Sequence, residues 1–146
     1  MAACRRIVCA TAAYLKKFGT PKVPNDLTHH RCLLLRQTDS NFATWTFNKG
    51  RVTERIRVSG HLASNDGEVV KNWVLNHQGI MLRSEWDVSA EIGRKQLVQV
   101  LTDYTAAPGD IGAWYLPGAQ KTARVAKFLD LLSDEFKGPQ SWRLPS

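Results

Sequence analysis

Segment Ser64-Asn65-Asp66-Gly67 is the part of the sequence best suited to bind a small ligand. It lies where a predicted strand ends and a predicted helix begins, and ligands of α/β sheets tend to bind at the carboxyl ends of strands. The first N–H groups of a helix can also bind an anion. The same residue types are ordinary helix caps, and the charges of Asp66 and Glu68 oppose an anion. Both interpretations, a ligand-binding turn and a plain cap, stay open on the local sequence.

Catalytic chemistry has no recognisable pattern in this sequence. It contains no nucleophile elbow, no phosphate-binding glycine loop and no paired-carboxylate pattern. The Gly-Asp-Ile-Gly segment at 109–112 is not a nucleotide motif, because a predicted strand follows it and not a helix. Cys9 and Cys32 fall in apolar predicted strands, where thiols are usually unreactive. We therefore expect a protein that is not an enzyme.

The cysteines and histidines do not predict a metal site. The sequence has three cysteines, an odd number without CxxC spacing, which argues against a zinc site or a disulfide framework and suits a reducing cytoplasm. The histidines have no partner at a metal-binding spacing: His29, His30, His61 and His77. We expect no metal and no cofactor.

The positive charge is scattered along the chain. The net charge is +7 over 146 residues, but the densest group, Arg51, Arg55 and Arg57, alternates with apolar residues, as on the solvent face of a strand. No apolar run approaches the roughly 20 residues of a membrane span. The run at 7–10 is too short for an export signal and predicts a buried strand. We therefore expect neither direct DNA contact nor membrane insertion from this chain.

Alternating strand and helix signals predict an α/β domain. The clearest unit is a strand at 61–63, a helix capped by Asn65 with Glu68 in the capping-box position, and a strand at 80–82. Such a βαβ unit predicts parallel strands. Further strands are predicted at 6–10, 32–35, 97–101 and 111–116, and further helices at 12–18, 84–94 and from 119 or 120 to 136.

A hairpin is predicted in the middle of the chain. Its strands are Trp45–Phe47 and Arg51–Val58, joined through Asn48-Lys49-Gly50, and Ser59-Gly60 is expected to break the second strand before 61–63. Residues 103–110 are a predicted loop and the best candidate for a domain boundary.

Several segments, in their order, resemble the effector-binding domain of LysR-type transcriptional regulators. The resemblance covers about residues 5–136, and each motif is weak alone, whereas their order and spacing together are specific. The motifs are Arg5-Arg6-Ile7-Val8-Cys9-Ala10, Gly19-Thr20-Pro21, Pro24-Asn25-Asp26-Leu27, His30-Arg31-Cys32-Leu33, Trp45-Thr46-Phe47, Asn65-Asp66-Gly67-Glu68, Gly79-Ile80 and Leu97-Val98-Gln99-Val100-Leu101.

The resemblance implies a fold of two subdomains, between which the chain crosses. The family has an α/β fold similar to type 2 periplasmic binding proteins, with a cleft between two subdomains that the chain crosses twice. By position, residues 5–102 would form the second subdomain, residues 103–136 the returning strand and helix of the first, and residues 137–146 a flexible tail.

The sequence departs from the family pattern at its start. The helix-turn-helix, the linker helix and most of the first subdomain have no counterpart, so we expect either a fragment or a truncated product. The strand at 111–116 and the last helix would then lack the sheet that they complete. Their apolar side chains should be exposed or buried against another copy, which predicts a homo-oligomer: Trp114, Val125, Phe128 and Leu132.

The resemblance also implies an effector site on one wall of the cleft. Carried over by position, its residues are Arg36, Gln37, Thr38, Ser64, Asn65, Asp66 and Arg83. The partner would be a small molecule, and Arg36 or Arg83 could pair with a carboxylate if it is an anion. The effector would bias the arrangement of the subdomains and so the grip on DNA, which only a separate helix-turn-helix domain would contact.

We expect this cytoplasmic sensor fragment to bind effector weakly when isolated, because half of the cleft is missing. The alternative is a fragment of a solute-binding protein of a transporter, which should carry an export signal. The sequence has no convincing one.

Overall fold

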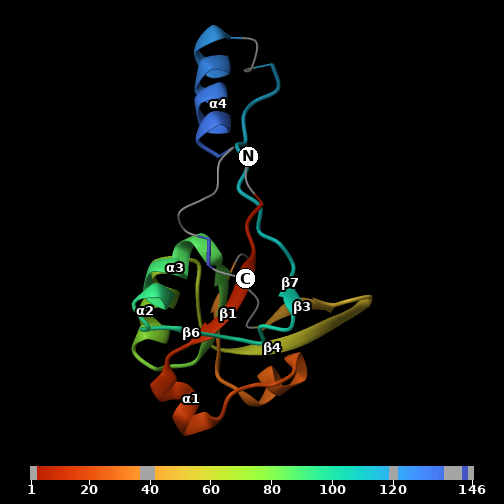
Figure 1. Cartoon of the computed structure of the whole chain (residues 1–146), viewed down its shortest axis with the longest axis vertical. Helices are drawn as coiled ribbons and strands as arrows, with labels where there is room; N and C mark the ends of the chain where they lie inside the picture. Colours follow the sequence, from red (N-terminus) through yellow and green to blue (C-terminus); the bar gives the residue numbers. More distant parts are fainter. Residues whose placement is uncertain (1–2, 37–41, 119–121, 137–142, 145–146) are drawn as a thin grey trace.

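The computed structural model of the chain describes residues 3–36, 42–118, 122–136 and 143–144. Its centre is a mixed sheet with the strand order β6-β1-β5-β2-β4-β3-β7 (Figure 1). Helices cover this sheet, so the predicted α/β class is confirmed. The strands are β1 Arg6–Ala10, β2 Cys32–Leu35, β3 Phe42–Lys49, β4 Val52–Ser64, β5 Ile80–Ser84, β6 Val98–Val100 and β7 Thr105–Ala106.

Parallel pairing is concentrated around β2. This strand lies between β4 and β5 and is parallel to both. The parallel direction predicted for the βαβ unit is therefore confirmed, although β2 separates its two strands. β1 pairs antiparallel with β5 and β6, and β3 pairs antiparallel with β4 and β7.

β4 is longer than the sequence predicts. The hairpin is confirmed, with Gly50 at a positive φ of 59° in its turn. The expected break at Ser59-Gly60 is wrong, because one strand of 13 residues runs through it. The outer part of β4 pairs with β3 and its last residues pair with β2. The register with β2 shifts beside Gly60, which pairs with Cys32 while Leu62 pairs with Leu33.

The helices follow their predicted positions with one corrected cap. They are α1 Ala12–Phe18, the 3-10 helix η1 Pro24–His29, α2 Gly67–Leu75, α3 Glu85–Gly93 and α4 Ala123–Glu135. Asp66 and not Asn65 is the N-cap of α2, because the Asp66 side chain accepts a hydrogen bond from the backbone N–H of Glu68. Among the described residues, no helix combines the length and the hydropathy needed to cross a bilayer.

The core lies between the sheet and its helices. Cys9, Leu33 and Ile80 from the central strands are fully buried together with Val70 and Val74 of α2. Tyr14 of α1 is also buried, and its hydroxyl accepts a hydrogen bond from the backbone N–H of Arg31 at 3.0 Å. These contacts fix α1 and α2 against the start of β2 and the beginning of β5.

The C-terminal part projects away from the sheet. Figure 1 shows α4 at the upper end of the molecule, beyond the segment that follows β7. The strand predicted at 111–116 is wrong: only Ile111 forms an isolated bridge, and no described strand accompanies the rest. Residues 103–110 are also not purely a loop, because Thr105–Ala106 forms β7 against β3.

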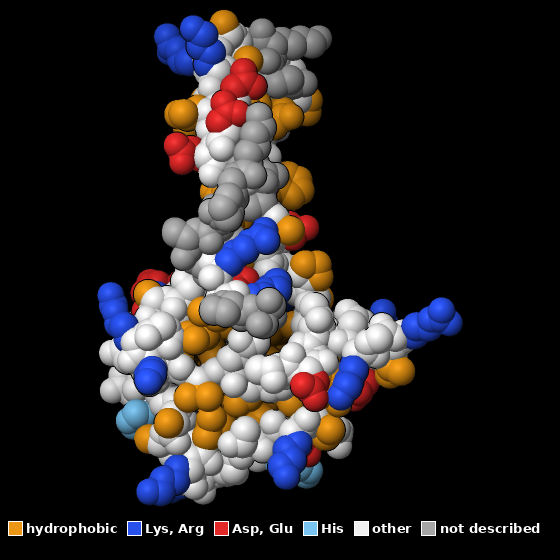
Figure 2. Space-filling view, in the orientation of Figure 1, with side chains coloured by type: hydrophobic (Ala, Val, Ile, Leu, Met, Phe, Trp, Pro, Cys, Tyr) orange, Lys and Arg blue, Asp and Glu red, His pale blue; other side chains and the backbone are white. Residues whose placement is uncertain are grey.

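Apolar side chains of this C-terminal part are exposed, as predicted. Trp114 is 100% exposed and Phe128 is 57% exposed, and α4 has no buried residue. Val125 and Leu132 are partly exposed. Figure 2 shows orange apolar side chains standing out along this upper part of the molecule. An exposed apolar surface of this kind is typical of a site that packs against a partner.

Gly79 provides a test of the packing between β5 and β2. A Cβ at this position would overlap the backbone carbonyl of Arg31 and lie 3.0 Å from Cγ of Leu33. That carbonyl accepts the N–H of Ile80 at 2.9 Å, so it cannot retreat without breaking the pairing. We expect Gly79→Ala to lower the free energy of unfolding by about 1–3 kcal/mol.

Urea denaturation measures this effect, with Gly93→Ala as the control. Nothing lies within 4 Å of a Cβ at Gly93, the last residue of α3. This control should leave stability unchanged or slightly raised, since alanine favours a helix. Equal destabilisation by both variants would contradict the packing argument.

Candidate functional site

Two segments far apart in the sequence lie side by side at one end of the sheet. Residues 3–6 include the first residue of β1 and the chain before it, and residues 107–110 follow β7; we call them the two crossing segments. The backbone N–H of Gly109 donates to the carbonyl of Cys4 at 3.0 Å, and the N–H of Cys4 donates to Oδ1 of Asp110 at 3.2 Å. The chain therefore passes this end of the sheet twice through a paired connection, which Figure 1 shows above β1.

The first crossing segment is also held to α3. Arg5 binds the carboxylate of Glu85 through Nη2 at 2.6 Å and Nε at 3.1 Å. The side chain of Glu85 is buried, and its Oε1 also accepts the backbone N–H of Leu144 at 2.7 Å. Burial alone would raise the pKa of Glu85, but the hydrogen bonds from Arg5 and Leu144 and the nearby positive charges lower it below its usual range.

A cavity of about 440 Å³ lies beside the crossing segments. It adjoins the last residues of β2 and β5, so it occupies the carboxyl ends of parallel strands where α/β sheets tend to bind ligands. Its walls come from both crossing segments and three strands: Arg6, Leu35, Thr44, Trp45, Arg83, Ser84, Pro108 and Gly109. Polar and apolar groups are thus combined around one space of ligand size.

Arg6 contributes a positive charge to this cavity. Burial, followed by the nearby charge of Arg83, lowers the pKa of Arg6 below its ordinary value. The stem of Arg6 packs against Gly109, where a Cβ would lie 3.2 Å from its Cγ and Cδ. Among the described residues, no carboxylate lies within ion-pair distance of Arg6, although the group remains charged at neutral pH because an arginine titrates far above it.

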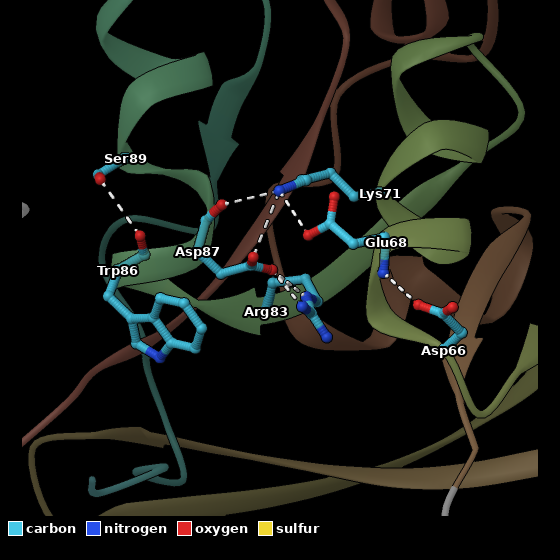
Figure 3. A network of polar contacts seen from close by, with 7 residues as sticks. All are labelled: Asp66, Glu68, Lys71, Arg83, Trp86, Asp87 and Ser89. Carbon is cyan, nitrogen blue, oxygen red and sulfur yellow. Dashed lines mark hydrogen bonds and ion pairs between the residues drawn. The ribbon is translucent and has the colours of Figure 1, made fainter.

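Arg83 has a different environment, although it lines the same cavity. Its guanidinium donates to Oδ2 of Asp87 from Nε at 2.6 Å and also from Nη2 (Figure 3). Lys71 of α2 binds the other oxygen of Asp87 at 3.4 Å and Glu68 at 2.9 Å. The side chain of Asp87 is only 6% exposed. This network joins α2, β5 and α3, and it compensates the charge of Arg83.

The predicted turn acts as a cap in the structure. The backbone N–H of Asp66 donates to Oγ of Ser64 at 3.1 Å, and Oδ1 of Asp66 accepts from the N–H of Glu68 at 2.8 Å. Asn65 is exposed. The structure brings Arg36 close to this turn, because its backbone N–H donates to the carbonyl of Ser64 at 2.7 Å.

The predicted ligand residues are only partly gathered around the cavity. Arg83 lines it, whereas Arg36, Ser64, Asn65 and Asp66 are not among the residues that line it. Gln37 and Thr38 lie outside the described residues. A ligand-binding role for these residues stays a prediction.

The buried thiols and the histidines have structural environments. Burial raises the pKa of Cys9 and of Cys32 to about 12, so both thiols stay protonated at neutral pH. Nδ1 of His77 contacts Oγ1 of Thr11 at 2.7 Å, and Nδ1 of His30 contacts the hydroxyl of Tyr14 at 3.2 Å. In the described part of the chain, no group of three or more potential ligands could hold a metal ion.

Comparison with known proteins decides the family. The sequence model of the LysR substrate binding domain matches residues 1–137. The chain belongs to this family. It is 37% identical over 129 residues to the HTH-type transcriptional activator TtdR of Escherichia coli K12, covering 88% of the chain and 41% of that protein. It is also 37% identical over 131 residues to the HTH-type transcriptional regulator DmlR of the same strain, covering 90% of the chain and 42% of DmlR.

Solved structures support the same fold for this LysR substrate-binding domain. The full-length Vibrio cholerae virulence activator AphB matches with a TM-score of 0.74 at 23% identity, over 92% of this chain and 46% of that one. The regulatory domain of CrgA from Neisseria meningitidis matches with a TM-score of 0.68 at 24% identity, over 92% of this chain and 65% of that one. The predicted resemblance and the periplasmic-binding-protein-like fold are confirmed.

The relatives also bear on two of the expectations from the sequence. They are transcriptional regulators, so the prediction that the chain is not an enzyme is confirmed and the transporter alternative is not favoured. The chain spans about two fifths of the length of the curated relatives it matches.

Sequence reasoning missed three polar side chains that line the cavity of this LysR domain, those of Arg6, Thr44 and Ser84. Arg6 is predicted only as the start of an apolar strand, and the available signal is its charge at the edge of that strand. Ser84 occupies the N-cap position of α3, but its side chain makes no capping hydrogen bond and instead lines the cavity. Thr44 gave no local signal, because β2 and β4 separate β3 from β5 in the sheet and only the tertiary structure brings Thr44 to the cavity.

Asp87 allows a test of the network around Arg83. Asp87→Asn leaves the two cations Arg83 and Lys71 beside a neutral amide in a nearly buried position. We expect the free energy of unfolding to fall by about 2–4 kcal/mol, because a buried charge loses its partner. Asp103→Asn is the matched control in the exposed pair with Lys49 and should cost less than about 1 kcal/mol by urea denaturation. Equal losses would contradict the proposed importance of the buried network.

Glu85 allows a test of the contact between the first crossing segment and α3. Its lowered folded-state pKa means that the ionised carboxylate stabilises the fold above the unfolded pKa of about 4.3. This stabilisation is lost as the pH falls through the folded pKa. We expect Glu85→Gln to cost about 1–3 kcal/mol at pH 7, where the charge-assisted bonds are present.

The pH dependence of urea unfolding distinguishes this ion pair from a packing effect. The difference between Glu85→Gln and the unaltered chain should shrink below about pH 4, where the carboxylate becomes protonated. If the variant and the unaltered chain differ equally in stability at pH 7 and below about pH 4, the loss comes from packing and not from charge.

Proposed function

We propose that this chain is the effector-sensing part of a LysR-type transcription regulator, with the effector bound in the cavity beside the two crossing segments. The observation that carries this proposal is that both segments line the cavity: Arg6 belongs to the first, and Pro108 and Gly109 belong to the second. A ligand in this space would touch both connections at once. Membership of the LysR substrate-binding family supports the assignment.

The proposed mechanism is differential binding to two arrangements of the chain. In this proposal residues 5–102 form one sensing subdomain and residues 103–136 return to the other. A ligand that fits one geometry of the crossing segments better shifts the population toward it. The size of the response is limited by the difference in affinity between the two arrangements.

The remaining predicted residues form the outer part of this proposed site. Leu35 lines the cavity at the end of β2, and Arg36 is the next residue. The hydrogen bond from Arg36 to Ser64 brings the turn of Ser64, Asn65 and Asp66 to the same edge of the sheet. Gln37 and Thr38 follow Arg36 in the sequence, and we propose them as further ligand contacts on the family resemblance.

The partners of the whole regulator follow from the same proposal. It acts in the cytoplasm as a homo-oligomer, and it contacts DNA through a helix-turn-helix domain of the kind that the names of its relatives state. The exposed apolar surface of the C-terminal part supports a packing partner. The isolated chain binds effector weakly, because it provides one part of the proposed cleft.

NMR titration tests the position of the site. Small acids, amines and sugars are added at millimolar concentration to the ¹⁵N-labelled chain, a range in which weak binding is measurable. We expect ligands that bind to shift the amide signals of residues 6, 44–45, 83–84 and 109 as one group. Thr44→Trp should abolish these shifts, because the larger side chain fills the cavity.

Thr53→Trp is the control for this substitution. Thr53 is exposed on the same hairpin and does not line the cavity. This variant should bind like the unaltered chain. Ligand-induced shifts confined to another surface, or full binding by Thr44→Trp, would refute the proposed site.

A further inference from the structure

Arg6 differs from the other charged groups around the cavity in having no described counter-charge. The four neighbouring charges of the network are mutually compensated, since Asp87 binds Arg83 and Lys71, and Lys71 also binds Glu68. Arg5, the adjacent residue, is paired with Glu85. Within the described ranges, the cavity therefore carries about one uncompensated positive charge, at the guanidinium of Arg6.

The position of Arg6 makes this charge costly without an anion. Its guanidinium is partly buried, its stem is fixed against Gly109, and the like charge of Arg83 lies nearby. Desolvation of a charge is unfavourable unless hydrogen bonds or an opposite charge replace the lost water. An anion in the cavity would supply both.

Two hydroxyl groups complete the polar lining. Ser84 has a hydroxyl that is not used to cap α3, and Thr44 contributes a second from β3. Serine and threonine hydroxyls can each donate a hydrogen bond to an oxygen acceptor. Trp45, Leu35 and Pro108 add apolar area for the rest of a small organic molecule.

We infer that the ligand of this cavity carries a carboxylate that pairs with Arg6. This inference rests on the proposed function and names the chemical class of its effector. A single guanidinium balances the single charge of a carboxylate and matches its two oxygens with a planar fork of donors. A phosphate group carries between one and two negative charges at neutral pH and would leave excess charge in the site.

Three probes of similar size separate the alternatives in NMR titrations of the full chain. They are butyrate, its neutral analogue butyramide, and inorganic phosphate. We expect butyrate to shift the signals of residues 6, 44, 84 and 109 and to bind at least tenfold more tightly than butyramide and than phosphate. A charge-assisted hydrogen bond supports a difference of this size.

Substitutions assign the charge to Arg6. Arg6→Gln should weaken butyrate at least tenfold and leave butyramide almost unchanged, whereas Arg6→Lys should recover part of the affinity by restoring the charge. Arg55→Gln is the control for lost positive charge, because Arg55 is exposed on β4 and does not line the cavity. It should bind butyrate like the unaltered chain. Unchanged amide spectra outside the cavity show that each variant is folded.

The outcomes separate this inference from the proposed function. Equal binding of butyrate and butyramide at the cavity would overturn the carboxylate and leave the cavity as the effector site. Phosphate binding as tight as that of butyrate, with the same loss in Arg6→Gln, would also overturn the carboxylate. The inference falls together with the proposed site if the three probes shift only signals outside the cavity, or if Thr44→Trp leaves butyrate binding unchanged.

Discussion

The parallel pairing of β2 with both β4 and β5 is the constraint on which the arrangement of the site depends. Parallel strands end at the same edge of a sheet, so this pairing brings Leu35, Ser64 and Ser84 to one edge. The starts of α2 and α3 follow directly from that edge. Gly79 permits the pairing, because any side chain there would collide with the backbone of Arg31. The crossing segments then close the space beside this edge.

Charge compensation divides the two arginines of the cavity into different roles. Arg83 is held by Asp87, and this contact links β5 to α3 while Lys71 extends it to α2. The network therefore stabilises the wall of the cavity. Arg6 has no such partner among the described residues and projects from the first crossing segment. Burying ionic groups costs desolvation free energy, so an uncompensated cation in a ligand-sized space is more informative about function than a paired one.

The C-terminal part is poorly packed, unlike the sheet and the helices that cover it. β7 is paired with β3, but the chain beyond it carries exposed Trp114, Leu116 and Phe128, and α4 buries none of its residues. An amphipathic helix normally gains its stability by burying its apolar face. The curated relatives are more than twice as long as the matched region.

The sequence by itself determined the local elements and the family. Hydrophobic periodicity and capping residues predicted the bounds of α1 and α3 and the start of α2 within one residue, because these signals act within a few positions of the chain. The order of weak motifs predicted the LysR family, which the comparisons confirmed.

The tertiary structure decided which distant residues meet. Only the sheet placed β2 between β4 and β5 and paired Arg6 with Ser84, and only the crossing segments brought Arg6 to Gly109. The ion pair of Arg83 with Asp87 was within reach of the sequence, at a spacing of four residues, but its burial depends on packing. The prediction of a strand at 111–116 was wrong because a strand requires a neighbouring strand, and the local sequence cannot supply one.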